Sequence, residues 1–185
     1  IRVLPKYRTL PRVLDKICSF YVAIFRGTPM VVQLLVFYYV LMPLMGIKID
    51  GLNVAITVFG LNSGAYVSEI MRGGILSVDP GQLEGGRSVG MSYATTMFKI
   101  VIPQAIKNIL PTLGNEFITL VKETSIVSFV GAMDLYKVFN DIGTNNYEFM
   151  VPYLVMAVIY IIIVCLITLG IKFRERRLRK SDRRC

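Results

Sequence analysis

The sequence predicts an all-α, polytopic membrane helix bundle, on the basis of its apolar composition, its long charge-free segments and the placement of its basic residues. The chain has 185 residues, of which 54% are hydrophobic and 18% are charged, and its mean hydropathy is +0.58. A typical soluble domain is about 25% charged. This balance belongs to a membrane protein or to an unusually apolar soluble one.

The composition also excludes several kinds of chemistry. Histidine is absent, which removes Ser-His and Cys-His catalytic pairs and His-ligated zinc. The three cysteines, Cys18, Cys165 and Cys185, are far apart and form neither a disulfide framework nor a C-x-x-C metal motif. We therefore expect no catalytic residue, no metal site and no enzymatic activity in this chain.

Four membrane spans are expected, at residues 17–44, 51–75, 101–131 and 150–171. A membrane-spanning helix needs about 20 mostly apolar residues. Met150–Ile171 and Gly51–Ser68 contain no charge. Met30–Ile47 has Gln33 as its only strongly polar side chain, and its apolar character extends back through residues 17–25. The span at 101–131 is the least apolar of the four, since it carries Lys107, Glu116, Lys122 and Glu123.

The basic residues support this scheme. With four spans, the N-terminal segment, the middle loop and the C-terminal tail share one side of the membrane, and they hold 18 of the 21 basic residues. These are Arg2, Lys6, Arg8, Arg12, Lys16 and Arg26, then Arg72, Arg87, Lys99 and Lys107, then Lys172, Arg174, Arg176, Arg177, Arg179, Lys180, Arg183 and Arg184. The positive-inside rule places all three regions, the C-terminus included, in the cytoplasm. The basic tail is interpreted as an orientation signal that contacts the lipid bilayer, with no nucleic-acid partner.

The middle loop, residues 76–100, carries its own helix signals. Asp79 is a predicted N-cap with Pro80 in the first helical position, so a helix is expected from Pro80 to about Val89. Gly90 supplies a stop, and Ser92 is a second N-cap. Pro103 is expected to break or kink the chain where it enters the membrane. From these residues alone, an ordinary interfacial elbow and a docking element for a cytoplasmic partner remain equally open.

The segment Glu84-Gly85-Gly86-Arg87-Ser88-Val89-Gly90-Met91-Ser92, followed by Ile100-Val101-Ile102-Pro103-Gln104-Ala105, resembles the EAA loop of permease subunits of ABC-type importers. That pattern reads Glu-Ala-Ala, three residues, Gly, and later Ile-x-x-Pro. This sequence has Gly85 and Gly86 where the family usually has alanines, and each glycine weakens a helix by up to about 1 kcal/mol. Three more blocks resemble the polar-amino-acid branch in the same order: 25–29 with 32–34, 65–70 with 72–75, and 113–117 with 122–125.

The resemblance implies the fold of a type I ABC importer permease with five spans, the first of which would precede this chain. It implies a bacterial cytoplasmic (inner) membrane location. The implied partners are a second permease subunit, identical or related, two cytoplasmic ABC ATPase subunits and an extracytoplasmic amino-acid-binding protein. No G-x-x-x-x-G-K-[ST] motif occurs, so we expect no cofactor here and ATP bound by the partner subunits. The residues that the resemblance implies for ATPase coupling are Asp79, Glu84, Arg87, Gly90, Met91 and Ser92.

Two polar stripes are candidates for substrate binding, because ionisable groups inside a membrane usually face protein or water. Asn115, Glu116, Thr119 and Glu123 lie near one helical face of the third span. Asn62, Ser63 and Glu69, with Tyr66, form a stripe on the second span, where Gly60 and Gly64 allow close helix approach. Under the family resemblance, an acid at position 116 favours basic amino acids. The alternative is structural, with Lys122 paired to a glutamate and Glu69 to Arg72.

Three functions are weighed on this basis. The first is the permease subunit, in which residues 131–148 either face the binding protein or form a solvated loop. The second is a proton- or cation-coupled secondary transporter that uses Glu69, Glu116 and Glu123. The third, an intramembrane serine enzyme built on Ser63, lacks a histidine base and would need Lys122 nearby.

Overall fold

The computed structural model describes residues 9–182, and side chains from 13 to 173; within that part the chain is helical and has no strand. The α-helices are α1 (Thr9–Gly27), α2 (Met30–Val36), α3 (Met42–Leu44), α4 (Gly51–Leu76), α5 (Pro80–Ser88), α6 (Tyr93–Thr96), α7 (Ile102–Glu123), α8 (Leu135–Asn146) and α9 (Met150–Asp182). Two π-helical turns, Phe37–Leu41 and Met97–Val101, and a 3₁₀ helix, Thr124–Val130, complete them. The predicted orientation signals Arg2, Lys6, Arg8, Arg183 and Arg184 lie outside the described residues.

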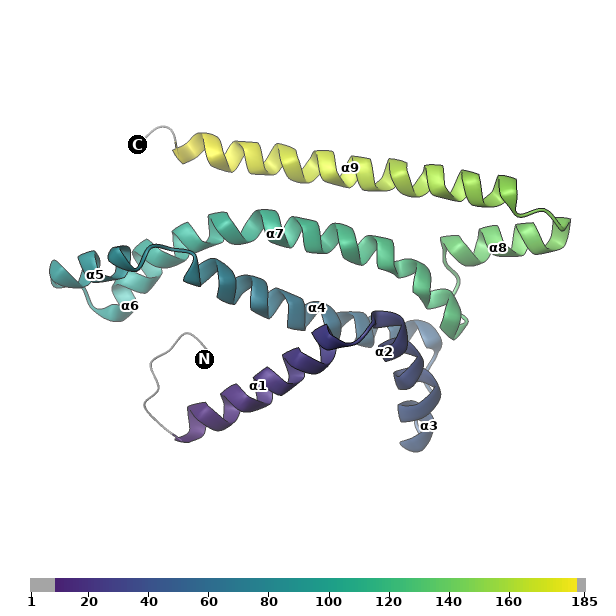
Figure 1. The fold of residues 1–185 in the computed structure, drawn as a ribbon, viewed down its shortest axis with the longest axis horizontal. Helices are drawn as coiled ribbons and strands as arrows, with labels where there is room; N and C mark the ends of the chain where they lie inside the picture. The colour runs from purple at the N-terminus through teal and green to yellow at the C-terminus, as the bar shows by residue number, and fades with distance from the viewer. Residues whose placement is uncertain (1–8, 183–185) are drawn as a thin grey trace.

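Three long helices form the body of the protein. Helix α7 lies between α4 and α9 and packs against both (Figure 1). At one end of this layer stand α5 and α6, and at the opposite end stands α8 (Figure 1). Helices α1 and α2 pack against α4, while α3 points away from the layer (Figure 1).

Two of the expected spans correspond to helices that are long and apolar enough to cross a membrane. These are α4 and the Met150–Phe173 portion of α9. In the part of the chain that the structure describes, a third is added only if the bent pair at residues 13–44 counts as one span. The segment expected at 101–131 is helical, as α7 and the 3₁₀ helix, but α7 fails the same test of length and composition. Its crossing of the membrane stays a prediction.

The span expected at 17–44 contains a sharp bend. Val13–Gly27 and Met30–Leu44 meet at 106°. The α region is disfavoured for the residue before a proline, which favours the end of α1 ahead of Pro29. Pro29 itself is extended, with φ −62° and ψ 139°. We call residues 27–30 the corner.

The corner frees carbonyl groups at the end of α1, and neighbouring side chains satisfy them. The Gln33 amide nitrogen donates to the carbonyls of Phe25 (2.9 Å) and Thr28 (2.9 Å). The Asn62 amide on α4 donates to the Phe25 carbonyl (3.1 Å) and to Gln33 Oε1 (3.0 Å). Thr28 Oγ1 donates to the Ile24 carbonyl (2.8 Å). Irregular backbone at membrane depth is tolerated only where such partners exist, so these amides make the bend possible.

Two apolar clusters hold the layer together, one toward each end. The first joins α2, α4 and the 3₁₀ helix through Leu34, Val58 and Val130. The second joins the end of α4 to the start of α7 through Val78, Val101, Ala105 and Ile109. Close helix approach explains the second cluster, because a Cβ on Gly74 would lie 2.1 Å from Ile109 Cγ1.

Of the break or kink expected at Pro103, the structure excludes the break. Helical geometry runs without interruption from α6 through the π-turn into α7, and the Ile102 N–H donates to the Met97 carbonyl. A proline in a helix collides with the carbonyl four residues earlier, here Lys99. Lys99 lies inside the π-turn, which is wider than an α-helical turn. The wider turn accommodates Pro103, which would otherwise end the helix.

Candidate functional site: the α5–α6 elbow and the polar face of α7

The segment between α4 and α7, residues 77–101, is called the elbow, and its caps are those predicted. Asp79 Oδ1 accepts a hydrogen bond from the Gly81 N–H (2.8 Å), with Pro80 opening α5. Gly90 has φ +85°, a left-handed conformation that suits glycine. Ser92 Oγ accepts from the Thr95 N–H (3.2 Å) and starts α6. The predicted helix–glycine–helix arrangement is confirmed.

Side-chain contacts fix the elbow to the long helices. Leu83 on the inner face of α5 packs against the second apolar cluster. The Gln104 amide on α7 donates to Gln82 Oε1 (3.1 Å), and the Asn108 amide donates to Ser77 Oγ (2.9 Å). Helix α5 is therefore anchored to the beginning of α7 and not suspended on a loose loop.

The residues predicted for ATPase coupling lie on the outside of this elbow. Asp79, Glu84, Arg87, Gly90 and Ser92 are exposed, and Met91 is half-buried. Glu84 and Arg87 are three residues apart and so share one face of α5.

Sequence analysis missed two apolar side chains of the elbow. Val89 is 77% exposed and Phe98 is 71% exposed. Exposed large apolar side chains beside charged ones are typical of surfaces that bind another protein. For Val89 the available signal was its position within the EAA-like block, whereas Phe98 lies between the two segments that carry the resemblance.

The α7 stripe is accessible along one side of the helix. Asn115 and Thr119 are exposed, and Glu116 and Glu123 are half-buried. Thr119 Oγ1 donates to the Asn115 carbonyl one turn earlier (3.1 Å), so this hydroxyl is bonded within its own helix. The two carboxylates remain the chemically distinctive groups of this face.

The α4 stripe, in contrast, is engaged in structural contacts. Asn62 is only 4% exposed and its amide serves the corner. Glu69 forms an ion pair with Arg72, whose Nη2 lies 2.7 Å from Glu69 Oε2, which is the pairing weighed as the structural alternative. Ser63 is half-buried. These contacts give Asn62 and Glu69 a structural role whether or not they also meet a substrate.

Arg26, which sequence analysis counted only as an orientation signal and part of a motif, connects the two stripes. Its Nη1 lies 3.8 Å from Glu69 Oε2, and its guanidinium lies over the Tyr66 ring at 5.2 Å from the centroid. It also interacts electrostatically with Glu116 on α7. Only the fold reveals this, because Arg26 is distant in sequence from Glu116.

An open cavity of about 440 Å³ lies between the end of α7 and α9. Its lining is Lys122, Ser125, Tyr160, Ile161, Val164 and Cys165. Apart from Lys122, none of the residues at its wall is charged, and it contains no residue of the predicted substrate stripes. Among the described residues, no group of three His, Cys, Asp or Glu side chains comes together as a metal site.

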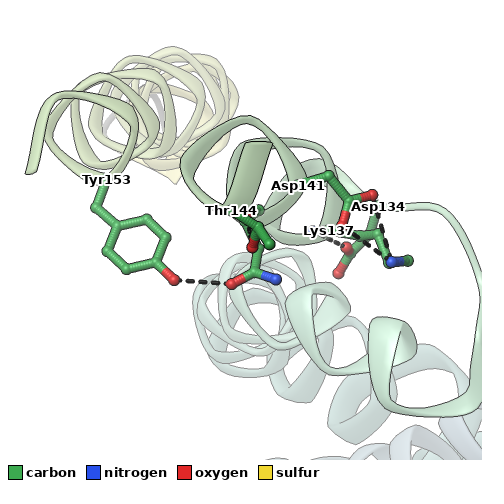
Figure 2. Close-up of polar contacts among 6 residues, drawn as sticks. Asp134, Lys137, Asp141, Thr144 and Tyr153 are labelled. Atoms are coloured by element: carbon green, nitrogen blue, oxygen red, sulfur yellow. Dashed lines mark hydrogen bonds and ion pairs between the residues drawn. The ribbon is translucent and has the colours of Figure 1, made fainter. Parts of the chain in front are cut away.

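The segment at 131–148 is mostly a capped helix, α8, and not an extended loop. Asp134 Oδ1 accepts from the Lys137 N–H (2.7 Å), and Lys137 Nζ lies 3.1 Å from Asp141 Oδ1. Figure 2 shows the Tyr153 hydroxyl of α9 pointing to the amide of Asn140, where it donates to Oδ1 (2.9 Å). Helix α8 is thus tied to α9, and its charged side chains lie on a defined surface.

The chain is similar to known proteins over most of its length. Residues 7–180 match the family described as binding-protein-dependent transport system inner membrane component. The chain is 40% identical over 166 residues to the arginine transport system permease protein ArtQ of Bacillus subtilis (strain 168), covering 90% of this chain and 76% of that protein. It is 42% identical over 167 residues to the putative glutamine transport system permease protein GlnP of Rickettsia bellii (strain RML369-C), covering 90% and 77%.

A solved structure agrees with these matches. The chain superimposes with a TM-score of 0.85 and 42% identity on a chain described as "Crystal structure of an amino acid ABC transporter with histidines". The overlap covers 90% of this chain and 77% of that one. The similarity therefore extends over the elbow, the corner and the long helices together.

Proposed function

Since the chain belongs to the family of binding-protein-dependent transport system inner membrane components and is a permease subunit of amino-acid ABC importers, we propose that it passes polar amino acids, basic ones preferentially, into the cytoplasm by ATP-driven alternating access. The predicted all-helical permease fold and family resemblance are confirmed by the family match and the solved structure. The observation that carries the mechanism is the elbow, which is anchored to α7 and presents exposed charged side chains.

The elbow supports coupling to separate ATPase subunits. Two cytoplasmic ATPase chains would bind and hydrolyse ATP, one contacting this elbow and one that of a second permease subunit. Glu84 and Arg87 are exposed on α5 and can form charge-assisted hydrogen bonds with a partner. Because Gln82 and Leu83 tie the same helix to α7, a displacement of α5 would move α7 with it.

The α7 face supports the substrate assignment. Its carboxylates Glu116 and Glu123 suit the cationic groups of an amino acid, and Asn115 and Thr119 are accessible beside them. Arg26 supplies the opposite charge within electrostatic range of Glu116, which suits an α-carboxylate. Relatives named for arginine and for glutamine support an amino-acid substrate, and the acid at 116 favours a basic one.

The sidedness follows from charge. The positive-inside rule places the elbow and the C-terminus on the cytoplasmic side of the bacterial inner membrane. Helix α8 would then face outward, where an amino-acid-binding protein delivers its cargo. A protease accessibility assay on sealed vesicles of known orientation measures this directly.

Neutralising the elbow charges tests the proposal. In Glu84→Gln/Arg87→Gln, we expect the purified complex to lose its ATPase subunits or its substrate-stimulated ATP hydrolysis, while the permease still inserts in the membrane. Lys137→Gln, which removes a half-buried charge paired with Asp141 at the opposite end of the bundle, is the control and should retain the ATPase subunits. Unchanged ATP-dependent uptake in the double variant would refute the coupling role.

The half-buried glutamates of α7 support a second candidate function, that of a proton- or cation-coupled secondary transporter. Vesicles with an imposed proton gradient and no ATP distinguish the two, because only the secondary transporter would accumulate amino acid. Glu116→Gln then addresses the substrate: we expect uptake of L-arginine to fall relative to L-glutamine. An unchanged ratio of the two would exclude Glu116 from recognition.

A further inference from the structure

A close contact inside the elbow explains one of its two glycines. Gly86 is buried on the inner face of α5, and a Cβ there would lie 2.4 Å from Thr96 Cγ2 and 2.9 Å from Thr96 Oγ1. At such distances something must shift. Thr96 is fully buried at 0% exposure, so it has no open space to move into.

Thr96 is also held in its rotamer. Its Oγ1 donates to the Ser92 carbonyl at 3.0 Å, and a β-branched side chain in a helix has few alternative χ1 positions. The hydrogen bond would have to break before the side chain could rotate away from a larger residue at position 86. The two helices therefore meet through a rigid contact, with backbone on one side and a fixed threonine on the other.

Gly85, the neighbouring glycine, is in a different situation. It is exposed, and a Cβ there would meet nothing within 4 Å. Alanine, the usual residue of the resembling loops at both positions, fits at 85 and collides at 86. Gly85 therefore has room for a side chain, and Gly86 does not.

The contact sits where α5 is attached to the rest of the protein. Gln82 and Gly86 are four residues apart, and Leu83 lies between them, so all three fall on the face of α5 that meets the α6–α7 helix. Glu84 and Arg87 are exposed. From Thr96, helical geometry continues through the π-turn into α7, which carries the polar stripe.

We propose that Gly86 and Thr96 are positioning residues whose combined size sets how α5 stands on the α6–α7 helix, and that this contact makes a displacement of α5 move α7. The proposal rests on the proposed function, since it assigns a role in coupling. According to the proposal, a larger side chain at position 86 impairs coupling and one at position 85 does not, although both positions belong to the same EAA-like block. It also makes the size of residue 96 the determinant of what position 86 accepts.

The complete transporter, reconstituted with its ATPase subunits in proteoliposomes, tests this as the wild type and as three variants: Gly85→Ala, Gly86→Ala and Gly86→Ala/Thr96→Ala. Two quantities are measured, uptake of L-arginine per ATP hydrolysed and amide hydrogen exchange over residues 80–96. For Gly86→Ala we expect uptake per ATP to fall at least about fivefold and exchange to rise by a similar factor, as overpacking at a fixed contact predicts. Gly85→Ala should stay within about twofold of wild type, since it adds only helix propensity.

The double variant distinguishes a disturbed contact between residues 86 and 96 from a general loss of folding. Removing Cγ2 and Oγ1 from residue 96 leaves its Cβ as the nearest atom, 3.2 Å from the Cβ that alanine would add at position 86, so exchange and uptake per ATP should return toward wild type. The proposal is overturned if Gly85→Ala and Gly86→Ala behave alike, if Thr96→Ala gives no rescue, or if exchange rises in Gly86→Ala while uptake per ATP is unchanged. Absence of ATP-dependent uptake in the wild type would instead refute the proposed function, and the exchange comparison would still decide whether the contact holds α5.

Discussion

The two bends of this chain, the corner at residues 27–30 and the elbow at residues 77–101, are stabilised by different kinds of interaction. At the corner, buried amides of Gln33 and Asn62 occupy the carbonyls that the bend frees. At the elbow, the hydrogen bonds of Asp79 and Ser92 lie at the surface, and the interior is apolar and closely packed.

The difference predicts opposite sensitivities. A buried hydrogen-bonded network loses much of its value when one member is removed, because the remaining polar groups have no water to replace the partner. A joint held by shape tolerates the loss of a surface hydrogen bond but not an added methyl group in its interior. We therefore expect the corner to be destabilised when a hydrogen-bonding side chain is removed, and the elbow to be destabilised when a methyl group is added to its interior.

The largest effect is expected at the corner. Asn62→Ala removes the Asn62 donor from the buried Gln33 Oε1 and one of the two donors from the Phe25 carbonyl, which keeps its hydrogen bond from Gln33 Nε2. We expect the free energy of unfolding to fall by about 3 kcal/mol. Equilibrium unfolding by denaturing detergent in mixed micelles, followed by circular dichroism, measures it.

Asn53→Ala is the matched control, because Asn53 is exposed on the same helix. Its loss of stability should stay within about 0.5 kcal/mol, as is usual for surface positions. Equal losses for the two asparagines would show that the network contributes nothing to the corner.

A smaller loss of stability is expected from adding a methyl group at Gly74, on α4 just before the elbow. In Gly74→Ala, the new methyl group would lie 2.1 Å from Ile109 Cγ1, so α4 and α7 must separate or Ile109 must leave its rotamer. Overpacking costs about 1–3 kcal/mol, offset in part by the better helix propensity of alanine. The same unfolding measurement applies.

Gly73→Ala is the control for this position, since a Cβ there meets nothing within 4 Å. It should stabilise the protein by up to about 1 kcal/mol. In an Ile109→Ala background, which itself costs about 2–5 kcal/mol, the added methyl group no longer collides, so Gly74→Ala should cost less stability there than in the wild type. An equal cost in both backgrounds would contradict the packing explanation.

The same two regions show what local sequence can predict. The elbow was predictable from Asp79, Pro80, Gly90 and Ser92, because caps and left-handed glycines act within a few residues. The corner was not, although Thr28 before Pro29 was a local signal against a continuous helix. Part of what holds the corner in place is Asn62, which is far away in sequence.

Long-range pairing limited the site predictions in the same way. The contact between Glu69 and Arg72 could be weighed from sequence, as the structural alternative, because the two residues lie one turn apart. The approach of Arg26 to Glu69, and its electrostatic interaction with Glu116, depends on the path of the chain through the corner. The fit of Gly86 to Thr96 was likewise outside sequence analysis, which treated both glycines of the block alike.

The smallest of the three effects concerns the surface cap of the elbow. Asp79→Ala removes the acceptor for the Gly81 N–H and should cost about 1 kcal/mol, less than the loss at the corner. Asp79→Asn keeps an acceptor oxygen and should cost only a few tenths of that. The unfolding measurement should therefore rank the alanine variant below the asparagine variant.

The same pair of variants separates capping from contact with the ATPase. If Asp79 acts only by starting α5, Asp79→Asn should keep substrate-stimulated ATP hydrolysis near the wild-type value, because the cap survives without the charge. If the carboxylate itself meets the partner, both variants should lose hydrolysis although only the alanine variant loses stability. Hydrolysis that follows stability across the two variants would place Asp79 with the structural residues of the elbow and leave Glu84 and Arg87 as its charged contacts.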